Sequence, residues 1–419
     1  MVEKKKLNIL LSAFRCEPGK GGEPGVGWNF AKNMADYHYV WVLTRRSHKK
    51  LIDEALLKNP IKNLFFIYYD IPQSALIDEK KLGEQAYYIL WQIFAITAYR
   101  KASKKVNFDL IHHVTFNQYR SPSIGFFIKK PFVMGPIGGA ETINSVFFQD
   151  LEFKGKLKEV WRNIGLDIFL FRLLCKIRNN PKTVVFSSVQ NLQKLGKHLG
   201  KKDKSAVIPA IAIDKEDFIK YIDKKSIETN KPFTIIYSGT AKDWKGLLLL
   251  LRAIKNAFNN ESNILVKLIG IRNEAEHQKV SKWLVDFEIA NKVQLINFLP
   301  REQVIEELKN ADISVYPAFR DSGSMSVLEA CALGCTVLCF DAGGQDAFPD
   351  HILLKIPVSD ISYQANLNNL SEKLKWSYNH PTEISKIGET ARNYVFENYT
   401  WQKKVITFSQ LYEDILIKN

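Results

Sequence analysis

The sequence predicts an α/β protein with two doubly wound domains, each built on a parallel sheet. Short apolar runs rich in β-branched residues alternate with longer helical patterns along the whole chain, as in parallel sheets with crossover helices. The length of 419 residues exceeds what one hydrophobic core usually supports, which favours two domains. Hydrophobic residues make up 46% of the chain, which is enough to bury a large core.

The expected strands occur in two series. Those of the first half are expected at residues 8–13, 40–44, 64–68, 110–114, 132–134 and 184–186. Those of the second half are expected at 233–237, 265–269, 292–296, 313–316 and 336–340, each followed by a helical segment. Because ligands bind at the carboxyl ends of strands in such sheets, we expect the site in a cleft between two facing domains.

A polar, lysine-rich stretch, DKKSIETNKP, marks the expected domain boundary. It follows Val207-Ile208-Pro209 and precedes a fresh strand. We therefore expect an N-terminal domain at 1–210 and a C-terminal domain at 211–398. The remaining residues, 399–419, contain TWQKKVITFSQLYEDIL, which predicts one amphipathic helix that packs back on the N-terminal domain.

The chain is basic, with 59 Lys or Arg against 44 Asp or Glu and a formal net charge of +15. This excess favours an anionic partner. The segment 155–180, GKLKEVWRNIGLDIFLFRLLCKIRNN, interleaves basic and apolar residues. Two interpretations stay open: a helix that lies on an anionic membrane surface, and a core-facing helix with a solvated basic edge. No recognition module accompanies the charge, which disfavours nucleic-acid binding.

Several classes of protein are disfavoured. Five cysteines in so long a chain argue against a secreted disulfide scaffold and favour a reducing cytoplasm. Cys331, Cys335 and Cys339 have a spacing like that of metal ligands, but the first two are expected in an apolar helix and the third in the next strand, as packing residues. The most apolar window, 86–99, is 14 residues long, whereas a membrane span needs about 20.

The first strand is followed by a glycine-rich loop, RCEPGKGGEPGVGWNF. Its glycines stand at 19, 21, 22, 25 and 27, and a helix is expected to begin near Val26. Such a loop offers free N–H groups and a positive helix end to an anion, although a long turn is the alternative. Phe30 occupies the place of the third glycine of a dinucleotide fingerprint, which disfavours a nicotinamide cofactor.

Two further loops carry charged residues at strand ends. In SGTAKDWKG, Lys245 is placed to neutralise phosphate charge, whereas Lys242 is better explained as a surface lysine. In DSGSMSVLE, Asp321 precedes a helix and Glu329 lies about one turn inside it. Capping of the helix and ligand binding are both open for Asp321. Glu329 would need a hydroxyl-rich partner if it faced the cleft, because an apolar run follows it.

The chain resembles glycosyltransferase family 4, the retaining, nucleotide-sugar-dependent group with the GT-B fold of two Rossmann-like domains. Asp321, seven residues and Glu329 resemble its E-x7-E signature, in the branch that also carries a CEPG and EPGVGW loop near the N-terminus. The segments DLIHHVTF (109–116), PFVMGPIGGAE (131–141) and FDAGG (340–344) resemble further motifs of that branch. The resemblance spans most of the chain in the same order.

The resemblance implies an acceptor-side N-terminal domain and a C-terminal domain that binds the nucleotide sugar. The residues implied in donor binding are Gly22, Glu23, Gly239, Thr240, Lys245, Phe298, Leu299, Asp321, Gly323, Ser324, Met325, Ser326 and Glu329. Those implied in catalysis are Lys245, Asp321 and, in preference to its neighbour His112, His113.

The same resemblance implies a role for each group. Glu329 would bind the ribose, Asp321 the donor sugar, and Lys245 with the N–H groups around Gly22 the diphosphate. The backbone of residues 323–326 would hold the sugar and distal phosphate, and that of residues 298–299 would read the base. The family needs no metal ion, no further cofactor and no protein nucleophile.

The implied function is transfer of a sugar from a nucleotide-diphosphate sugar to a glycan or lipid-linked acceptor, in bacterial surface polysaccharide synthesis at the inner face of the membrane. Departures from the family keep alternatives open. Thr240 stands where arginine is usual, Ser324 where glycine is usual, and Gln345 where proline is usual. A non-catalytic GT-B scaffold that binds a glycan or a partner transferase, and a nucleotide-sugar 2-epimerase, are the alternatives.

Overall fold

The computed structural model describes residues 5–72, 79–164, 181–198, 205–222, 231–323 and 325–417. The chain forms two compact units. Unit 1 comprises Met1–Ala140, Gly165–Ala212 and Trp401–Asn419, and unit 2 comprises Glu141–Ile164 and Ile213–Thr400. The sequence had placed residues 141–164 in the first domain. They belong to unit 2 because Phe147 stacks on Phe319 at 4.1 Å and Asp150 pairs with Arg252 at 2.6 Å.

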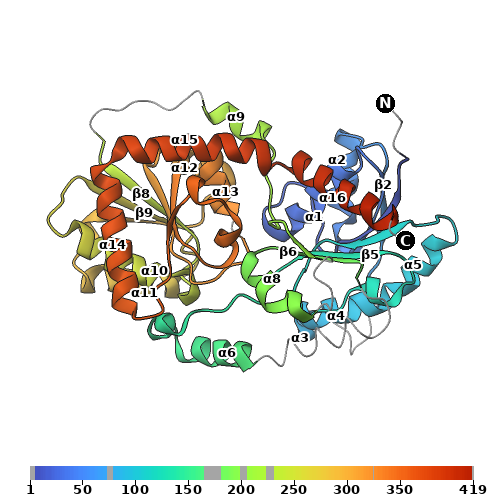
Figure 1. The fold of residues 1–419 in the computed structure, drawn as a ribbon, viewed down its shortest axis with the longest axis horizontal. Coiled ribbons are helices and arrows are strands. Elements are labelled where there is room, and N and C mark those ends of the chain that lie inside the picture. The colour runs from blue at the N-terminus through green and yellow to red at the C-terminus, as the bar shows by residue number, and fades with distance from the viewer. Residues whose placement is uncertain are drawn as a thin grey trace. The chain divides into compact units, whose positions relative to one another are not determined.

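Unit 1 contains a parallel sheet of seven strands in the order β3-β2-β1-β4-β5-β6-β7. Figure 1 labels β2, β5 and β6 of this sheet. Its strands are β1 (Asn8–Ser12), β2 (Tyr39–Thr44), β3 (Leu64–Tyr68), β4 (Leu110–His113), β5 (Phe132–Ile137), β6 (Thr183–Phe186) and β7 (Ser205–Val207). The chain fills the sheet outward from β1 in one direction and from β4 in the other. The strand order therefore reverses between β1 and β4, where doubly wound sheets bind ligands.

The described helices of unit 1 are α1 (Gly22–Met34), α2 (Lys49–Lys58), α3 (Glu79–Leu82), α4 (Glu84–Phe94), α5 (Ile96–Ser103), α8 (Val189–Leu195) and α16 (Trp401–Ile417). Helix α1 begins at Gly22, four residues before the expected start near Val26. Two backbone carbonyl oxygens of the preceding loop leave no room for side chains at Gly25 and Gly27. A Cβ added to either glycine would lie only 2.1 Å from one of these oxygens. These two glycines therefore serve close packing of the loop on the first turns of the helix.

The C-terminal helix α16 packs on α1 within unit 1. Phe408 meets Phe30 with ring centroids 5.2 Å apart, and Ser409 lies 2.8 Å from the ring of His38. A third contact joins Tyr412 to His112 at 2.6 Å. The last residues of the chain thus complete the core of the unit that contains its first residues.

Unit 2 contains a parallel sheet of six strands in the order β10-β9-β8-β11-β12-β13. Its strands are β8 (Phe233–Ser238), β9 (Ile264–Ile269), β10 (Val293–Ile296), β11 (Ile313–Tyr316), β12 (Thr336–Phe340) and β13 (Leu354–Ile356). Its described helices are α6 (Phe153–Ile164), α9 (Glu216–Ile222), α10 (Leu247–Phe258), α11 (Glu274–Asp286), α12 (Arg301–Asn310), α13 (Met325–Ala332), α14 (Tyr363–Asn379) and α15 (Pro381–Asn398). Here the strand order reverses between β8 and β11.

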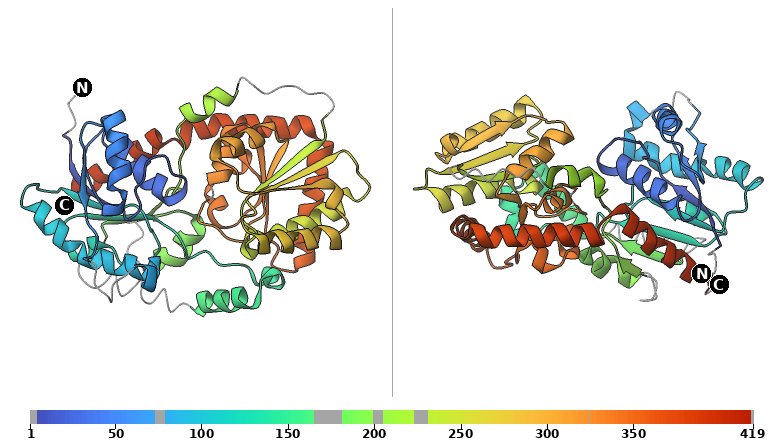
Figure 2. Two further views of the ribbon diagram at one scale, coloured as in Figure 1. Left: turned by 180° about the vertical axis from the view of Figure 1, so that it is seen from behind. Right: turned by 90° about the horizontal axis from the view of Figure 1, so that it is seen from above.

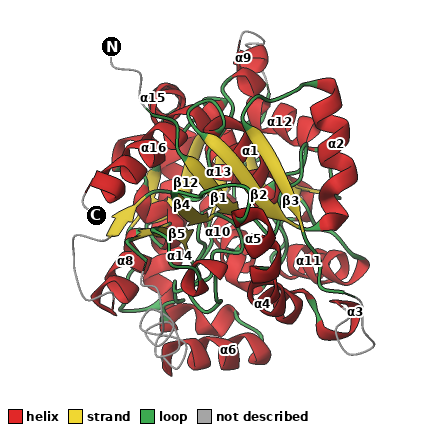
Figure 3. Cartoon of the chain, turned by 90° about the vertical axis from the view of Figure 1, so that its right-hand side faces the viewer, coloured by secondary structure: helices red, strands yellow, loops and turns green. Residues whose placement is uncertain are grey.

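In each unit the strands form a twisted sheet between helices (Figures 2 and 3). This architecture confirms the predicted fold class, and every expected strand is present with small shifts at its ends. The sequence missed two edge strands, β7 and β13, which have three residues each and too little pattern to be recognised.

The cysteines and the apolar window also have structural explanations. Cys331 in α13, Cys335 just after that helix and Cys339 in β12 are buried, as packing residues are, whereas Cys175 lies outside the described residues. The window 86–99 forms α4 and the start of α5, in which Tyr88 and Trp91 are fully buried. Over the described parts of the chain, no helix is long and apolar enough to cross a bilayer.

Candidate functional site

In unit 2, two predicted site residues meet where the strand order reverses. Lys245 follows β8 in a short 3-10 helix, η6 (Asp243–Lys245), and Asp321 follows the neighbouring strand β11. The Lys245 Nζ lies 2.6 Å from Asp321 Oδ2 and 2.5 Å from the Tyr316 hydroxyl. The Tyr316 hydroxyl also donates to Asp321 Oδ2. The three side chains thus form one compact, charge-assisted cluster.

Gly246, the residue after Lys245, allows the two loops of this cluster to approach each other closely. It adopts a φ of +72°, and an added Cβ would lie 2.0 Å from the Pro317 carbonyl oxygen. Only glycine fits this left-handed position so close to another backbone. The loop after β8 can therefore rest on the end of β11. Trp244 supports the lysine from another side, with Nζ 4.6 Å from the centre of its indole ring.

The loop that carries Asp321 rests on the FDAGG segment. An added Cβ at Gly343 would lie 2.5 Å from the Asp321 carbonyl oxygen, and one at Gly344 would lie 2.4 Å from the Gly323 nitrogen. The Gly344 N–H donates to the same Asp321 oxygen at 2.5 Å. The two glycines thus allow the backbone of the FDAGG segment to pack directly against the Asp321 loop. Ser324 lies outside the described residues.

Glu329 lies on α13 and is paired with an arginine that the sequence analysis did not single out. The residue Glu329 is only 7% exposed, and its Oε1 accepts a hydrogen bond from Arg301 Nε at 2.7 Å. Arg301, the first residue of α12, also reaches Asp217 of α9 at 3.1 Å. Burial raises the pKa of Glu329, and the charge of Arg301 opposes this effect.

The remaining predicted residues of unit 2 lie after β8, after β10 and at the start of α13. Gly239 donates its N–H to the Ile269 carbonyl at 2.9 Å, so this group belongs to the sheet. The Thr240 carbonyl accepts a hydrogen bond from the Tyr237 hydroxyl at 2.7 Å. Phe298 is 67% exposed after β10, and Leu299 beside it is half-buried. Met325 and Ser326 form the first turn of α13.

In unit 1, the two adjacent histidines at the end of β4 differ in their hydrogen bonds. His112 is held at both ring nitrogens, by Tyr412 at 2.6 Å and by the Gly135 carbonyl at 2.7 Å. His113 Nε2 lies 3.1 Å from the Tyr88 hydroxyl, whereas its Nδ1 makes no hydrogen bond of normal geometry in the described part of the chain, and the Phe116 backbone lies beside the ring. Burial lowers the pKa of His113 to about 4, so its ring is neutral near pH 7.

Gly22 and Glu23 come close to His113 through the segment after β4. The Glu23 carboxylate accepts a hydrogen bond at 3.0 Å from the N–H of Phe116, whose ring centre lies 4.8 Å from that of Tyr88. Gly22 opens α1 with a φ of +64° and faces open space, and the N-cap residue of this helix, Gly21, has no side chain to cap it. The structure thus brings Gly22, Glu23 and His113 to the end of unit 1 where the strand order reverses.

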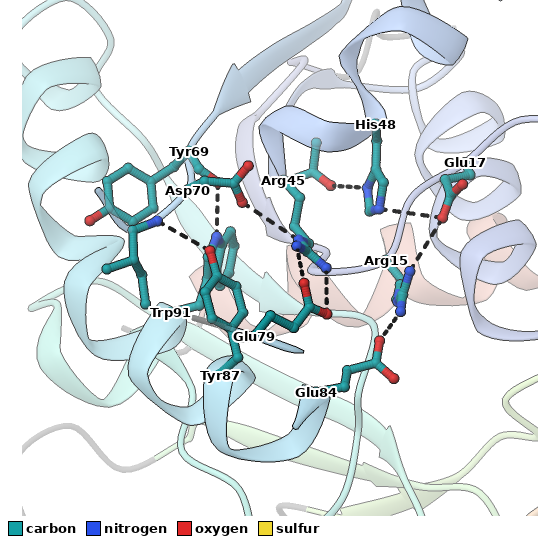
Figure 4. A network of polar contacts seen from close by, with 12 residues as sticks. Arg15, Glu17, Arg45, His48, Tyr69, Asp70, Glu79, Glu84, Tyr87 and Trp91 are labelled. Atoms are coloured by element: carbon teal, nitrogen blue, oxygen red, sulfur yellow. Dashed lines mark hydrogen bonds and ion pairs between the residues drawn. The ribbon is translucent and has the colours of Figure 1, made fainter. Parts of the chain in front are cut away.

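A polar network beside this cluster was not predicted (Figure 4). Arg45, after β2, forms two hydrogen bonds with Glu79, at 3.1 and 2.6 Å, and its guanidinium lies 5.0 Å from the centre of the Phe14 ring. Arg15, after β1, pairs with Glu84 and, at 3.6 Å, with Glu17. The network ties the loops after the first strands to α3 and α4. The sequence did not predict it because the pairs of Arg45 with Glu79 and of Arg15 with Glu84 join elements far apart in the chain.

Comparison with known proteins agrees with this geometry. Residues 218–351 match the sequence profile of the family described as Glycosyl transferases group 1. An uncharacterized glycosyltransferase of Methanocaldococcus jannaschii is 22% identical over 74% of this chain and 76% of its own length. A lipopolysaccharide 1,2-N-acetylglucosaminetransferase of Salmonella typhimurium is 26% identical over 42% of this chain and 47% of its own length.

The fold is similar to that of several solved structures. Sucrose-phosphate synthase of Thermosynechococcus elongatus aligns over 99% of this chain and 100% of its own, with a TM-score of 0.67 and 16% identity. Anabaena HepE in complex with UDP-glucose aligns over 99% and 100%, with a TM-score of 0.60 and 15% identity. The chain therefore has the GT-B fold. Its second unit carries the sequence features of group 1 glycosyltransferases.

Proposed function

We propose that this chain is a retaining glycosyltransferase of family 4, in the branch with the EPGVGW loop, and that it uses a nucleotide-diphosphate sugar. The observation that carries the proposal is the cluster of Lys245, Asp321 and Tyr316. It lies at the carboxyl ends of adjacent strands where the strand order reverses, inside the segment that matches the family. Doubly wound sheets bind nucleotides at this position.

In this proposal Lys245 stabilises the leaving group. As the bond from the anomeric carbon to the diphosphate breaks, negative charge grows on the phosphate oxygens, and an ammonium group nearby lowers the barrier. Asp321 accepts hydrogen bonds from hydroxyls of the donor sugar. The departing phosphate accepts the proton of the acceptor hydroxyl as the new bond forms on the same face, so no side chain acts as a nucleophile.

Glu329 and Arg301 hold the nucleoside in the same proposal. A buried carboxylate that keeps one oxygen on Arg301 is suited to accept hydrogen bonds from both ribose hydroxyls with the other. The exposed ring of Phe298 lies two residues from Pro300, which precedes Arg301, so the base would lie along residues 298–299. UDP-sugars are the first donors to test, since a protein of similar fold was solved with UDP-glucose.

The N–H groups around Gly22 and the Nδ1 of His113 are proposed to act from unit 1. The start of α1 has no side-chain cap, so its N–H groups suit the diphosphate. The neutral ring of His113 suits a hydroxyl of the donor sugar better than a phosphate, because it carries no charge.

The acceptor is proposed to be a glycan or lipid-linked glycan of a bacterial surface polysaccharide, and transfer is proposed to need no metal ion. The lipopolysaccharide transferase among the relatives supports the choice of acceptor. Work at the inner membrane surface is supported by α6, on which Phe153, Leu157 and Trp161 are 80%, 51% and 59% exposed between lysines. Such a surface suits anionic lipid.

A thermal-shift screen of nucleotides and nucleotide sugars tests the proposal. Ligand at 100 times its dissociation constant should stabilise the chain by about 2.7 kcal/mol. Glu329→Ala should abolish the shift, because it removes the ribose contact, whereas Glu389→Ala, at an exposed position of α15, should keep it. Any hit is then incubated with acceptor glycans, with and without a chelator, for product analysis.

Four results would count against parts of this proposal. No shift with any nucleotide favours the non-catalytic scaffold. Formation of an epimerised sugar without an acceptor favours the 2-epimerase. Loss of transfer in the chelator contradicts metal independence. Donor binding that survives Glu329→Ala unchanged removes the role proposed for Glu329.

A further inference from the structure

We propose that unit 2 carries a second carbohydrate site, in which Glu159 binds hydroxyl groups of a neutral sugar residue. The site is a pocket of about 400 Å³ bounded by α6, the loop 241–244, the start of α11 and Arg320. This volume falls in the range of about 300 to 1,000 Å³ that is usual for small-molecule sites. It adjoins the proposed donor site, because Trp244 lines it and also supports Lys245, but Lys245, Asp321 and Glu329 do not line it.

Glu159 is a buried carboxylate with one oxygen left over. The residue is 2% exposed, and its Oε1 lies 3.0 Å from Arg320 Nη2. The other oxygen, Oε2, has no hydrogen-bond partner within the described ranges of the chain. A buried oxygen without a donor is costly. Because Arg320 already balances the charge of Glu159, a neutral hydroxyl group of a ligand is a sufficient donor.

Contacts between α6 and the loop after β8 fix the shape of the pocket. Asp243 Oδ2 accepts a hydrogen bond from the Glu152 N–H at 2.7 Å, next to the start of α6. Lys279 of α11 joins the two residues, at 2.7 Å from the Glu152 carboxylate and 3.0 Å from that of Asp243. Gly155 of α6 also lies near Asp243: a Cβ added to this glycine would be 3.9 Å from Asp243 Oδ2. The pocket is therefore built by packing within unit 2.

The chemistry of the walls favours a neutral sugar over an anion. Four basic and four acidic side chains line the pocket, so it offers no net charge to a phosphate. One of the lysines, Lys279, is already engaged by two carboxylates. Ile143, Leu151 and Trp244 add apolar surface for the C–H face of a sugar ring. The ligand is a free monosaccharide or one residue of a longer glycan.

Isothermal titration of the intact chain tests the pocket. Glucose, galactose, mannose and N-acetylglucosamine, and oligosaccharides of each, are titrated with UDP in excess to occupy the proposed donor site. We expect at least one sugar to bind, and we expect Glu159→Gln to raise the dissociation constant of that sugar at least tenfold. Ala275→Trp, at an exposed position on the pocket wall, should abolish binding while leaving Glu159 in place. Glu389→Gln is the matched control.

The outcomes distinguish free sugar from a residue of a longer glycan, and they distinguish this pocket from the proposed donor site. Tighter binding of an oligosaccharide than of its monosaccharide assigns the pocket to a glycan residue, and equal binding assigns it to free sugar. The proposal is overturned by no binding of any sugar, by competition from UDP, by preference for inorganic phosphate, or by normal binding in both pocket variants. The test needs no turnover, so sugar binding without UDP binding would count against the donor site alone.

Discussion

The ammonium group of Lys245 is restrained from three sides, by Asp321, Tyr316 and Trp244. This restraint orients the charge before any ligand arrives, which is the condition under which electrostatic stabilisation of a transition state is most effective. Glu329 is oriented in a different way, by one hydrogen bond from Arg301. The two carboxylates of the DSGSMSVLE segment thus serve separate ion pairs.

Lys245→Ala should lower kcat by about 100-fold to 1,000-fold, the usual effect of removing one oxyanion donor. Binding of uridine, which has no phosphate, should change little, because the proposed contact of Lys245 is with the diphosphate. Steady-state kinetics and titration with uridine measure the two effects. Lys255→Ala, in a partly exposed pair on α10, is the control. Equal losses in turnover and in uridine binding would contradict a leaving-group role.

At the scale of elements, α6 differs from an ordinary surface helix because it buries an acidic side chain and exposes several apolar ones. The acidic Glu159 is buried against Arg320, whereas Phe153, Leu157 and Trp161 are exposed. An apolar face turned to solvent is unfavourable unless something covers it. Lys154 and Lys158 are exposed beside this face, which suits an anionic lipid surface.

The chain should therefore sediment with anionic liposomes at low salt and be released at high salt, since each basic residue near the surface contributes about 1 kcal/mol. The double variant Leu157→Ser, Trp161→Ser should reduce the bound fraction because it removes apolar contact. Leu57→Ser, at an 83% exposed position of α2, is the matched control. No binding at low salt, or equal binding of the double variant, would refute a membrane role for α6.

At the scale of the whole molecule, the two units should respond differently to acid. Burial lowers the pKa of His112 to about 3 and the pKa values of His48 and His113 to about 4, all in unit 1. The unfolded chain takes up protons on these rings below about pH 6.5, whereas the folded chain does not until near pH 4. Their contribution to stability is present above pH 6.5 and is lost as the pH falls toward 4.

Unit 1 should accordingly open before unit 2 between pH 6.5 and 4. One pKa unit corresponds to about 1.4 kcal/mol, so three histidines together change the free energy of unfolding by several kcal/mol. The raised pKa of Glu23, about 7, has the opposite sign and offsets part of the histidine effect in unit 1, and the raised pKa of Glu329 likewise favours folded unit 2 in acid. Hydrogen exchange of the intact chain, corrected for intrinsic rates, compares peptides from β4 and β11. Earlier loss of protection in β11 would contradict this expectation.

The sequence by itself determined the fold class, and it supplied the chain segments of the proposed donor site. Strands and crossover helices follow from local periodicity, and Lys245, Asp321 and Glu329 were found because each lies in a short segment next to a strand or at a helix start. The glycine-rich loop was predicted to offer N–H groups to an anion, and the use of Gly25 and Gly27 to pack the loop on α1 was not predicted.

Only the tertiary structure decided which side chains are partners. Arg301 meets Glu329 across 28 residues of sequence, and Arg320 meets Glu159 across a much longer separation. It also decided that residues 141–164 belong to unit 2 and that His113, unlike His112, keeps a ring nitrogen without a hydrogen bond of normal geometry among the described residues. Hydrogen bonds and burial depend on distances that the folded sheets create, and no local pattern encodes those distances.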